Sequence, residues 1–167
     1  MSLIVETGSG DATAESYCSV AAASTYHADR GNAAWAALTS DALREQALRK
    51  ATDYMLQKYR TSWKGVRQVF NQALDWPRLN VIVDEYRCVL MNTVPNEVIH
   101  ACAELALKAA TAELNPDLSQ QILQQTVGPI STTYSESSPQ SKRYASIDMM
   151  LRPLLTGSSI SHQVVRS

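Results

Sequence analysis

The sequence predicts a mainly α-helical fold: a small helical bundle with two long amphipathic helices, a minor β strand or hairpin, and flexible arms at both ends. Two long segments place apolar residues at steps of three or four, which is the spacing of one face of a helix. One short segment alternates with a period of two, as a half-buried strand does. Both ends carry Gly and Ser residues, which favour loops over regular structure.

The longest helical pattern runs from Val94 to Leu114. Pro95 fits its first helical position, where a missing N–H costs nothing. The many alanines of this segment let other helices approach closely, so we expect it to be the central helix of the bundle. Its apolar face is formed by Val98, Ile99, Cys102, Leu105, Ala106 and Ala109, and its polar face by Glu97, Glu104 and Lys108.

A second long helix is predicted over DALREQALRKATDYMLQKYR, residues 41–60, after a cap at Thr39 or Ser40. We expect it to pack against the central helix. Its apolar face is formed by Leu43, Ala47, Leu48, Ala51, Tyr54, Met55 and Tyr59.

Shorter elements surround these two helices. Ser19 can cap a helix from Val20 to Asp29 that stops at Gly31. Residues 32–38 predict a brief helical turn that buries Trp35.

The segment between the two long helices predicts turns, with a short helix near residues 68–74 and a short strand at residues 81–83. Pro77 keeps Trp76 out of the helical region, so we expect a sharp exit with the indole buried.

After the central helix, residues 117–125 predict a polar helix, and residues 127–135 alternate as an edge strand would. Apolar residues between Tyr144 and Leu154 predict a last helix.

The predicted organisation is one domain with loose ends. It comprises an N-terminal extended segment (1–18), a helical domain (19–155) with a strand near 127–135, and a C-terminal arm (156–167). The arm is polar apart from a few apolar and β-branched residues, a composition suited to docking as an added strand on a partner. The residues expected to dock are Ile160, His162, Val164 and Val165.

Composition excludes few functions. A chain of 167 residues, 45% hydrophobic and 19% charged, is ordinary for one globular domain, and a net charge of -1 gives no overall attraction to nucleic acid. No apolar run is long enough to span a membrane, and the start lacks a basic signal-peptide region, so we expect no membrane partner and synthesis in a cytosol. The three cysteines form no CxxC pair and are interpreted as small core residues.

Catalytic and metal-binding patterns are not found. His27, His100 and His162 lie on separate elements, and none belongs to an HExxH motif or has a cysteine at ligand spacing. Phosphate-binding loops and nucleophile elbows are also missing from the sequence. We therefore expect no enzyme activity, no cofactor, and no catalytic, metal or cofactor-binding residue.

One stretch has a composition typical of single-stranded nucleic-acid binding. It combines cations and aromatic rings with no acidic residue over residues 58–70. The alternative interpretation is a helix end, where the dipole favours cations and the aromatic rings face the core. The residues are Lys58, Tyr59, Arg60, Trp63, Lys64, Arg67 and Phe70.

An ordered set of short segments carries a family resemblance over nearly the whole chain. These are the opening SLIVETGSG, Ser16-Tyr17 followed by Tyr26-His27-Ala28 and Gly31, QALDWPR at 72–78, the VP-led ACAELAL helix, VGPIS with a following Tyr, and Ile147, Leu151 and Leu154. In this order they resemble tailed-phage head-tail connector (adaptor, head-completion) proteins, whose members are often labelled DnaT-like single-stranded DNA-binding proteins.

This resemblance implies a helical domain assembled as a dodecameric ring under the portal protein, extending the channel through which double-stranded DNA passes without sequence-specific contacts. The implied partners are the portal protein, neighbouring copies of the chain, and a stopper or tail-completion protein. The implied location is the head-tail junction of a virion, after synthesis in the host cytoplasm. No catalytic residue is implied. The alternative function is a DnaT-like single-stranded DNA-binding module in replication, which the basic-aromatic stretch motivates.

Overall fold

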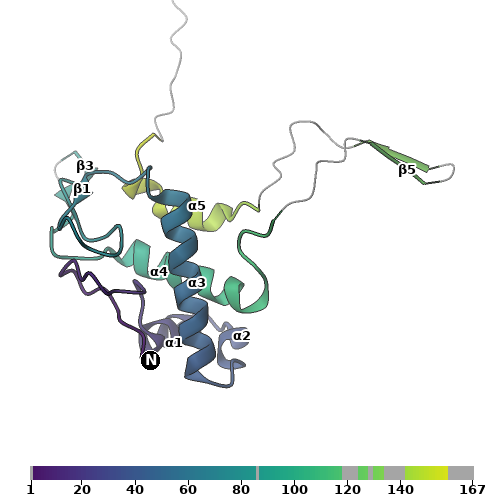
Figure 1. Cartoon of the computed structure of the whole chain (residues 1–167), viewed down its shortest axis with the longest axis horizontal. Helices are drawn as coiled ribbons and strands as arrows, with labels where there is room; N and C mark the ends of the chain where they lie inside the picture. Colours follow the sequence, from purple (N-terminus) through teal and green to yellow (C-terminus); the bar gives the residue numbers. More distant parts are fainter. Residues whose placement is uncertain (1, 86, 118–123, 128–129, 134–141, 158–167) are drawn as a thin grey trace, which may run out of the picture.

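Two helices pack across each other at the centre of the protein (Figure 1). These helices are α3, Asp41–Tyr59, and α4, Asn96–Thr111. The structure is a computed structural model, and it describes residues 2–85, 87–117, 124–127, 130–133 and 142–157. The hydroxyl of Ser40 caps α3 by accepting a hydrogen bond from the Leu43 backbone N–H. The described part of the chain is mainly helical.

Pro95 lies one position before the first residue of α4, so its predicted place inside the helix is wrong by one residue. Its ψ of 146° is extended, which makes it the N-cap residue, and Asn96 begins the helix. The fixed φ of proline still suits this position, because an N-cap needs no backbone donor of its own.

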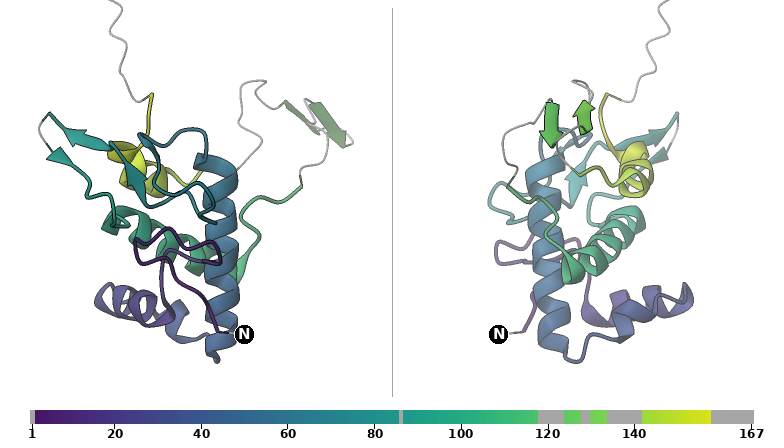
Figure 2. Two further views of the ribbon diagram at one scale, coloured as in Figure 1. Left: turned by 60° about the vertical axis from the view of Figure 1, so that its left-hand side comes forward. Right: turned by 90° about the vertical axis from the view of Figure 1, so that its right-hand side faces the viewer.

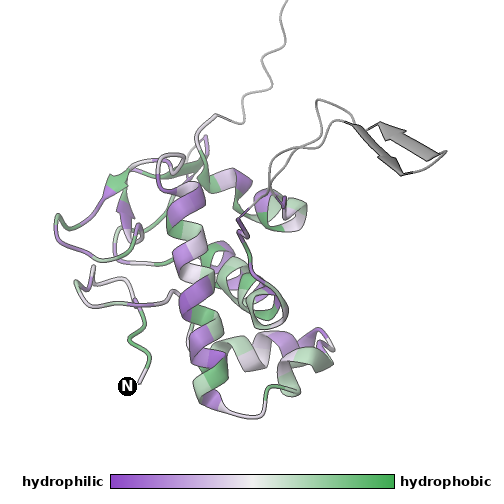
Figure 3. Ribbon diagram, turned by 45° about the vertical axis from the view of Figure 1, so that its right-hand side comes forward, coloured by the Kyte–Doolittle hydropathy of each residue, from purple (hydrophilic) through white to green (hydrophobic). Residues whose placement is uncertain are grey.

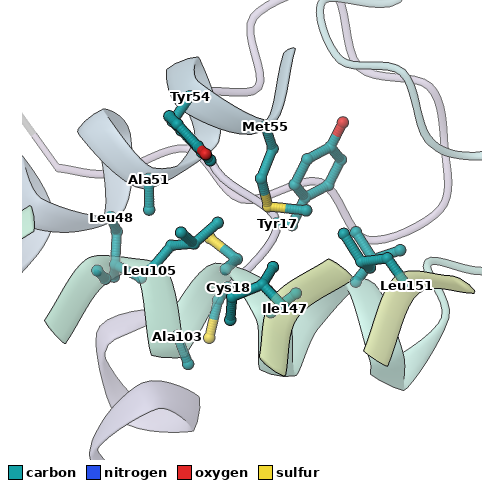
Figure 4. Packing of buried hydrophobic residues seen from close by; sticks show 14 of the residues in the cluster. Tyr17, Cys18, Leu48, Ala51, Tyr54, Met55, Ala103, Leu105, Ile147 and Leu151 are labelled. Carbon is teal, nitrogen blue, oxygen red and sulfur yellow. The ribbon is translucent and has the colours of Figure 1, made fainter. Parts of the chain in front are cut away.

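The core lies where α3, α4 and the C-terminal helix α5 (Ala145–Leu151) meet (Figure 4). α3 and α5 contribute large apolar side chains, and α4 contributes several alanines that allow close packing. Figure 3 shows hydrophilic and hydrophobic residues alternating along α3, as expected for a helix with one face in the core. The core residues labelled in the close view are Tyr17, Cys18, Leu48, Ala51, Tyr54, Met55, Ala103, Leu105, Ile147 and Leu151.

Two short helices cover the opposite end of α3 from α5 (Figure 2). α1 spans Val20–Asp29, the predicted range, and α2 spans Ala33–Ala36. Trp35 is buried as predicted, and its indole N–H donates to the Ser24 hydroxyl at 3.0 Å.

The first residues of the chain are packed, so the prediction of a flexible N-terminal arm is wrong for residues 2–18. Val5 bridges to Ser16, which closes the loop between them. The carboxylate of Glu6 is buried and accepts hydrogen bonds from the backbone N–H groups of Gly8, Gly10 and Asp11 at 2.7–3.0 Å. These bonds satisfy the loop's backbone donors and give it a fixed shape.

Residues 61–92 contain two small antiparallel pairs, and the strand predicted at residues 81–83 is found one residue later, at residues 82–84. β1 (Val66–Arg67) pairs with β2 (Arg78–Leu79), and β3 (Ile82–Asp84) pairs with β4 (Arg87–Cys88). Cys88 is exposed, so interpreting it as a core residue is wrong. Cys18 and Cys102 are buried as expected.

The helix predicted near residues 68–74 is not formed, because the buried side chain of Gln72 takes over the backbone hydrogen bonding of this segment. Its amide oxygen accepts from the Val69 N–H at 2.8 Å, and its amide nitrogen donates to the carbonyls of Leu74 and Pro77. The result is a series of turns that leads into a cis peptide bond between Trp76 and Pro77. The indole of Trp76 is fully buried, as predicted.

After α4 the chain forms a hairpin, β5 (Gln124–Val127) with β6 (Ile130–Thr133). Residues 124–125 are therefore strand, although a helix was predicted to reach them. The strand predicted over 127–135 is found as β6 together with the last residue of β5, and residues 128–129 and 134–135 lie outside the described part.

α5 continues into a 3₁₀ turn, η1 (Arg152–Leu154). The predicted docking residues of the C-terminal arm, Ile160, His162, Val164 and Val165, lie outside the described residues.

Candidate nucleic-acid interface

Cations from distant parts of the sequence line one groove beside the C-terminal half of α3. Two adjoining clefts of about 430 and 400 Å³ share Lys58, Arg143 and Asp148. We call their union the α3–α5 groove. Its charged and aromatic residues are Lys58, Tyr59, Lys142, Arg143, Asp148 and Arg152, with Tyr54 at one end.

Asp148 lies in the middle of the α3–α5 groove and joins α5 to α3. Its carboxylate accepts hydrogen bonds from the Lys58 ammonium at 2.7 Å and the Tyr59 hydroxyl at 2.6 Å. Burial acts to raise the pKa of Asp148, but the hydrogen bonds from Lys58 and Tyr59 outweigh it and hold that pKa below its ordinary value. Burial, together with the hydrogen bond to Asp148, raises the pKa of Tyr59. Asp148 is therefore ionised at neutral pH and fixes the position of Lys58.

A third cleft, of about 560 Å³, adjoins this groove at Tyr54, Gln57 and Asn115. We call it the α4-end cleft, because the last residues of α4 form one wall. Lys50, Asp53, Tyr54 and Gln57 of α3 line it together with residues 109–115.

An aromatic pair lies beside both clefts. The rings of Tyr54 and Tyr144 meet edge to face with centroids 5.6 Å apart. The ammonium of Lys58 lies 5.6 Å from the Tyr54 ring, and that of Lys108 lies 5.9 Å from the Tyr144 ring. Such mixtures of cations and rings are what single-stranded nucleic-acid binders use.

The residues of the basic-aromatic stretch, 58–70, do not form one surface in the structure. Trp63 is buried, with only 4% of its surface exposed, and packs edge to face on Trp76 with ring centroids 5.6 Å apart. Its indole therefore lies in the core, as the alternative interpretation of this stretch expected. Phe70 is 99% exposed in the loop before Trp76.

The cations of the stretch make different contacts. Arg60 donates to the buried carboxylate of Asp75 at 3.1 Å, and Arg67 donates to the Gln72 carbonyl. The Lys64 ammonium donates to the carbonyls of Ile82 and Pro153. Of these cations, Lys58 is the one that lines the α3–α5 groove.

Sequence reasoning missed the other half of the groove. Lys142 ends the Ser-rich segment 135–142, Arg143 follows it, and Arg152 lies in the 3₁₀ turn after α5, so all three look like ordinary surface residues in the sequence. The one local signal that could have indicated Lys142 and Arg143 is their position as a Lys-Arg pair just before an amphipathic helix.

The described residues contain no group of His, Cys, Asp and Glu side chains that could hold a metal ion. Among the helices in that same part of the chain, none is both long and apolar enough to cross a membrane.

A family model described as "Putative DnaT-like ssDNA binding protein" matches residues 1–167. The chain belongs to this DnaT-like family. No curated protein and no solved structure matches it.

Membership of the DnaT-like family confirms the DnaT-like part of the resemblance drawn from the sequence. It corrects the other part, the role of a head-tail connector. The expectation of a structural head-tail connector is wrong, because the family description names single-stranded DNA binding and nothing in the match points to a portal protein, a ring or a virion. The match instead favours the alternative function, and it suggests DNA as the partner of the DnaT-like chain.

Proposed function

We propose that this chain binds single-stranded DNA, with the α3–α5 groove as the path of the strand. The observation that carries the proposal is the convergence of Lys58, Lys142, Arg143 and Arg152 on one concave surface. The family match supports the class of ligand, and the groove supports the place. This is the activity expected of a single-stranded DNA-binding module in replication.

The chemistry of the groove suits a sugar-phosphate backbone. Lysine and arginine side chains neutralise phosphates and release bound counterions, which supplies most of the affinity in sequence-tolerant binding. Lys142 and Arg143 are exposed, so their side chains can follow a bound strand without unfolding any element. The net charge of -1 means that attraction comes from this local cluster and not from the whole molecule.

The groove also offers surfaces for bases. Met149 lines the groove and is 72% exposed, and Tyr144, half-buried at the start of α5, lies beside the groove against Tyr54. An unpaired strand has free base faces that can lie on such groups, whereas the bases of a duplex are stacked on one another. This difference predicts a preference for single strands over duplex.

The test measures fluorescence anisotropy of a labelled mixed-sequence oligonucleotide of about 20 nucleotides, longer than a typical single-domain site. We expect the Lys142→Ala/Arg143→Ala variant to bind at least about tenfold more weakly at low salt, because two phosphate contacts are lost. The matched control is Arg30→Ala/Arg87→Ala, which removes the same charge from the C-cap of α1 and from β4, outside the groove. Its affinity should stay within about twofold of the parent.

Equal weakening in both variants would show that binding follows net charge and has no defined path. If neither the parent protein nor any variant binds the oligonucleotide at low salt, the proposed function is wrong. A duplex of the same sequence serves as competitor, and displacement of the single strand by equal amounts of duplex would also contradict the proposal.

A further inference from the structure

We propose that the α4-end cleft holds one base of the bound strand and favours bases that carry an exocyclic amino group over thymine. This inference rests on the proposed function and adds a base preference to it. The cleft meets the α3–α5 groove at Tyr54, Gln57 and Asn115, so a strand in the groove can place a base there. Its volume of about 560 Å³ lies within the range of small-molecule sites.

One wall of the cleft is the C-terminal end of α4, which presents hydrogen-bond acceptors. The last four carbonyls of a helix have no partner within the helix. Here the Lys108 carbonyl accepts from the Ala112 N–H and the Thr111 hydroxyl. Within the described part of the chain, the carbonyls of residues 109–111 accept no hydrogen bond from another residue. The negative end of the helix dipole lies at the same place.

Asp53 adds a carboxylate to the opposite wall. Among the described residues it makes no ion pair and accepts no side-chain hydrogen bond, although it lies on α3 within a helical turn of Lys50 and Gln57. Partial burial raises its pKa, because the charged form loses solvation. A carboxylate that has lost part of its solvation and has no partner is stabilised by a ligand that donates hydrogen bonds to it.

These acceptors select the ligand. A carboxylate and the end of a helix dipole both repel phosphate, so this cleft suits a neutral group, and the cations of the α3–α5 groove take the backbone. Cytosine and adenine each carry an amino group with two N–H donors, and guanine carries an amino group beside a ring N–H. Thymine has a single N–H, so it can donate to Asp53 or to the α4 carbonyls but not to both, whereas an amino group has one N–H for each wall. Leaving polar groups unpaired in this way costs affinity.

The two α3 side chains that flank Asp53 can complete the recognition. The ammonium of Lys50 and the amide of Gln57 are donors, and both line the cleft. The carbonyl oxygen beside the ring nitrogen on the pairing edge of cytosine and guanine can accept from them. The thymine oxygens can accept as well, so thymine ranks last because it lacks the second N–H. The strongest preference is therefore expected for cytosine and guanine, with adenine next and thymine last.

The experiment compares unlabelled dC, dA and dT oligonucleotides of about 20 nucleotides as competitors for one labelled dC strand. We expect dC to compete about five- to tenfold better than dT, the discrimination that one well-made base contact provides. Asp53→Asn replaces a pure acceptor by a group with two N–H donors, so the ratio of dC to dT should fall below about two. Asp29→Asn removes the same charge from the exposed last residue of α1 and should leave the ratio unchanged.

Each outcome separates this inference from the proposed function. Equal competition by dC, dA and dT with the parent protein would overturn the base preference and leave the proposed function standing. An unchanged ratio in Asp53→Asn would overturn the assignment of the preference to this cleft. If no oligonucleotide binds, both proposals fail. Because Asp53 is exposed at the surface of α3, thermal melting of Asp53→Asn is expected to match the parent.

Discussion

Trp63 and Trp76 show how one residue type in two contexts led to opposite predictions. Trp76 precedes a proline, which excludes it from a helix and favours an inward indole, and the structure buries it fully. Trp63 lies among cations, which suggested stacking on bases, yet it packs on Trp76. The local pattern for Trp63 fits both a core residue and a stacking residue. Only its distant partner distinguishes them.

We predict that Trp76→Ala lowers the free energy of unfolding by about 3–5 kcal/mol, because it empties a large volume in a closed part of the core. Trp76→Phe should cost clearly less. The indole N–H has no hydrogen-bond partner in the described part of the chain. Replacing Trp76 by phenylalanine therefore removes packing contacts but no hydrogen bond. Urea denaturation of the three proteins gives these values. An unfolding midpoint for Trp76→Ala equal to that of the parent would show that the site tolerates a cavity.

At the scale of elements, the sequence predicted those whose signal is local. The ranges of α1 and α3 followed from caps at Ser19 and Ser40 and from the spacing of apolar residues. The turns around Gln72 could not be predicted in this way, because that buried side chain bonds to backbone groups on both sides. Propensity favours a helix there, and these specific hydrogen bonds override it.

A second prediction follows from the packing of α3 on α4. Ala106 is fully buried on α4, and a leucine at this position must push neighbouring side chains or the helices apart. We expect Ala106→Leu to lower the free energy of unfolding by about 1–3 kcal/mol. Ala110, exposed one turn later on the same helix, is the control, and Ala110→Leu should change stability by less than about 0.5 kcal/mol. Thermal melting followed by circular dichroism measures both, and equal effects would contradict the close approach of these helices.

At the scale of the whole molecule, the candidate site is the part that sequence reasoning could least predict. Lys58 and Asp148 lie 90 residues apart, and no periodicity or spacing connects them. The sequence correctly singled out Lys58, but it grouped this lysine with Arg60, Lys64 and Arg67, which contact other parts of the protein. A groove built from separated segments becomes visible only when the chain is folded.

The small net charge of the molecule makes the salt dependence of binding informative. If the three groove cations other than Lys58, whose charge Asp148 offsets, each neutralise one phosphate, the logarithm of the association constant should fall with the logarithm of salt concentration at a slope of about −2. Lys142→Ala/Arg143→Ala should reduce that slope by roughly 1.4, since two contacts are removed. Anisotropy titrations between low and physiological salt give both slopes. A slope near zero in the parent would mean that phosphate contacts contribute little to binding.

The position of α5 in the chain has a consequence for how the protein forms during synthesis. Its side chains Ile147 and Leu151 are fully buried against α3 and α4, but they are made after Thr111, the last residue of α4. At about 5–20 residues per second, the apolar face shared by α3 and α4 stays uncovered for roughly 2–7 s between the end of α4 and the start of α5. During that interval the nascent chain presents a surface that a chaperone can hold, and α5 covers that surface once it is made.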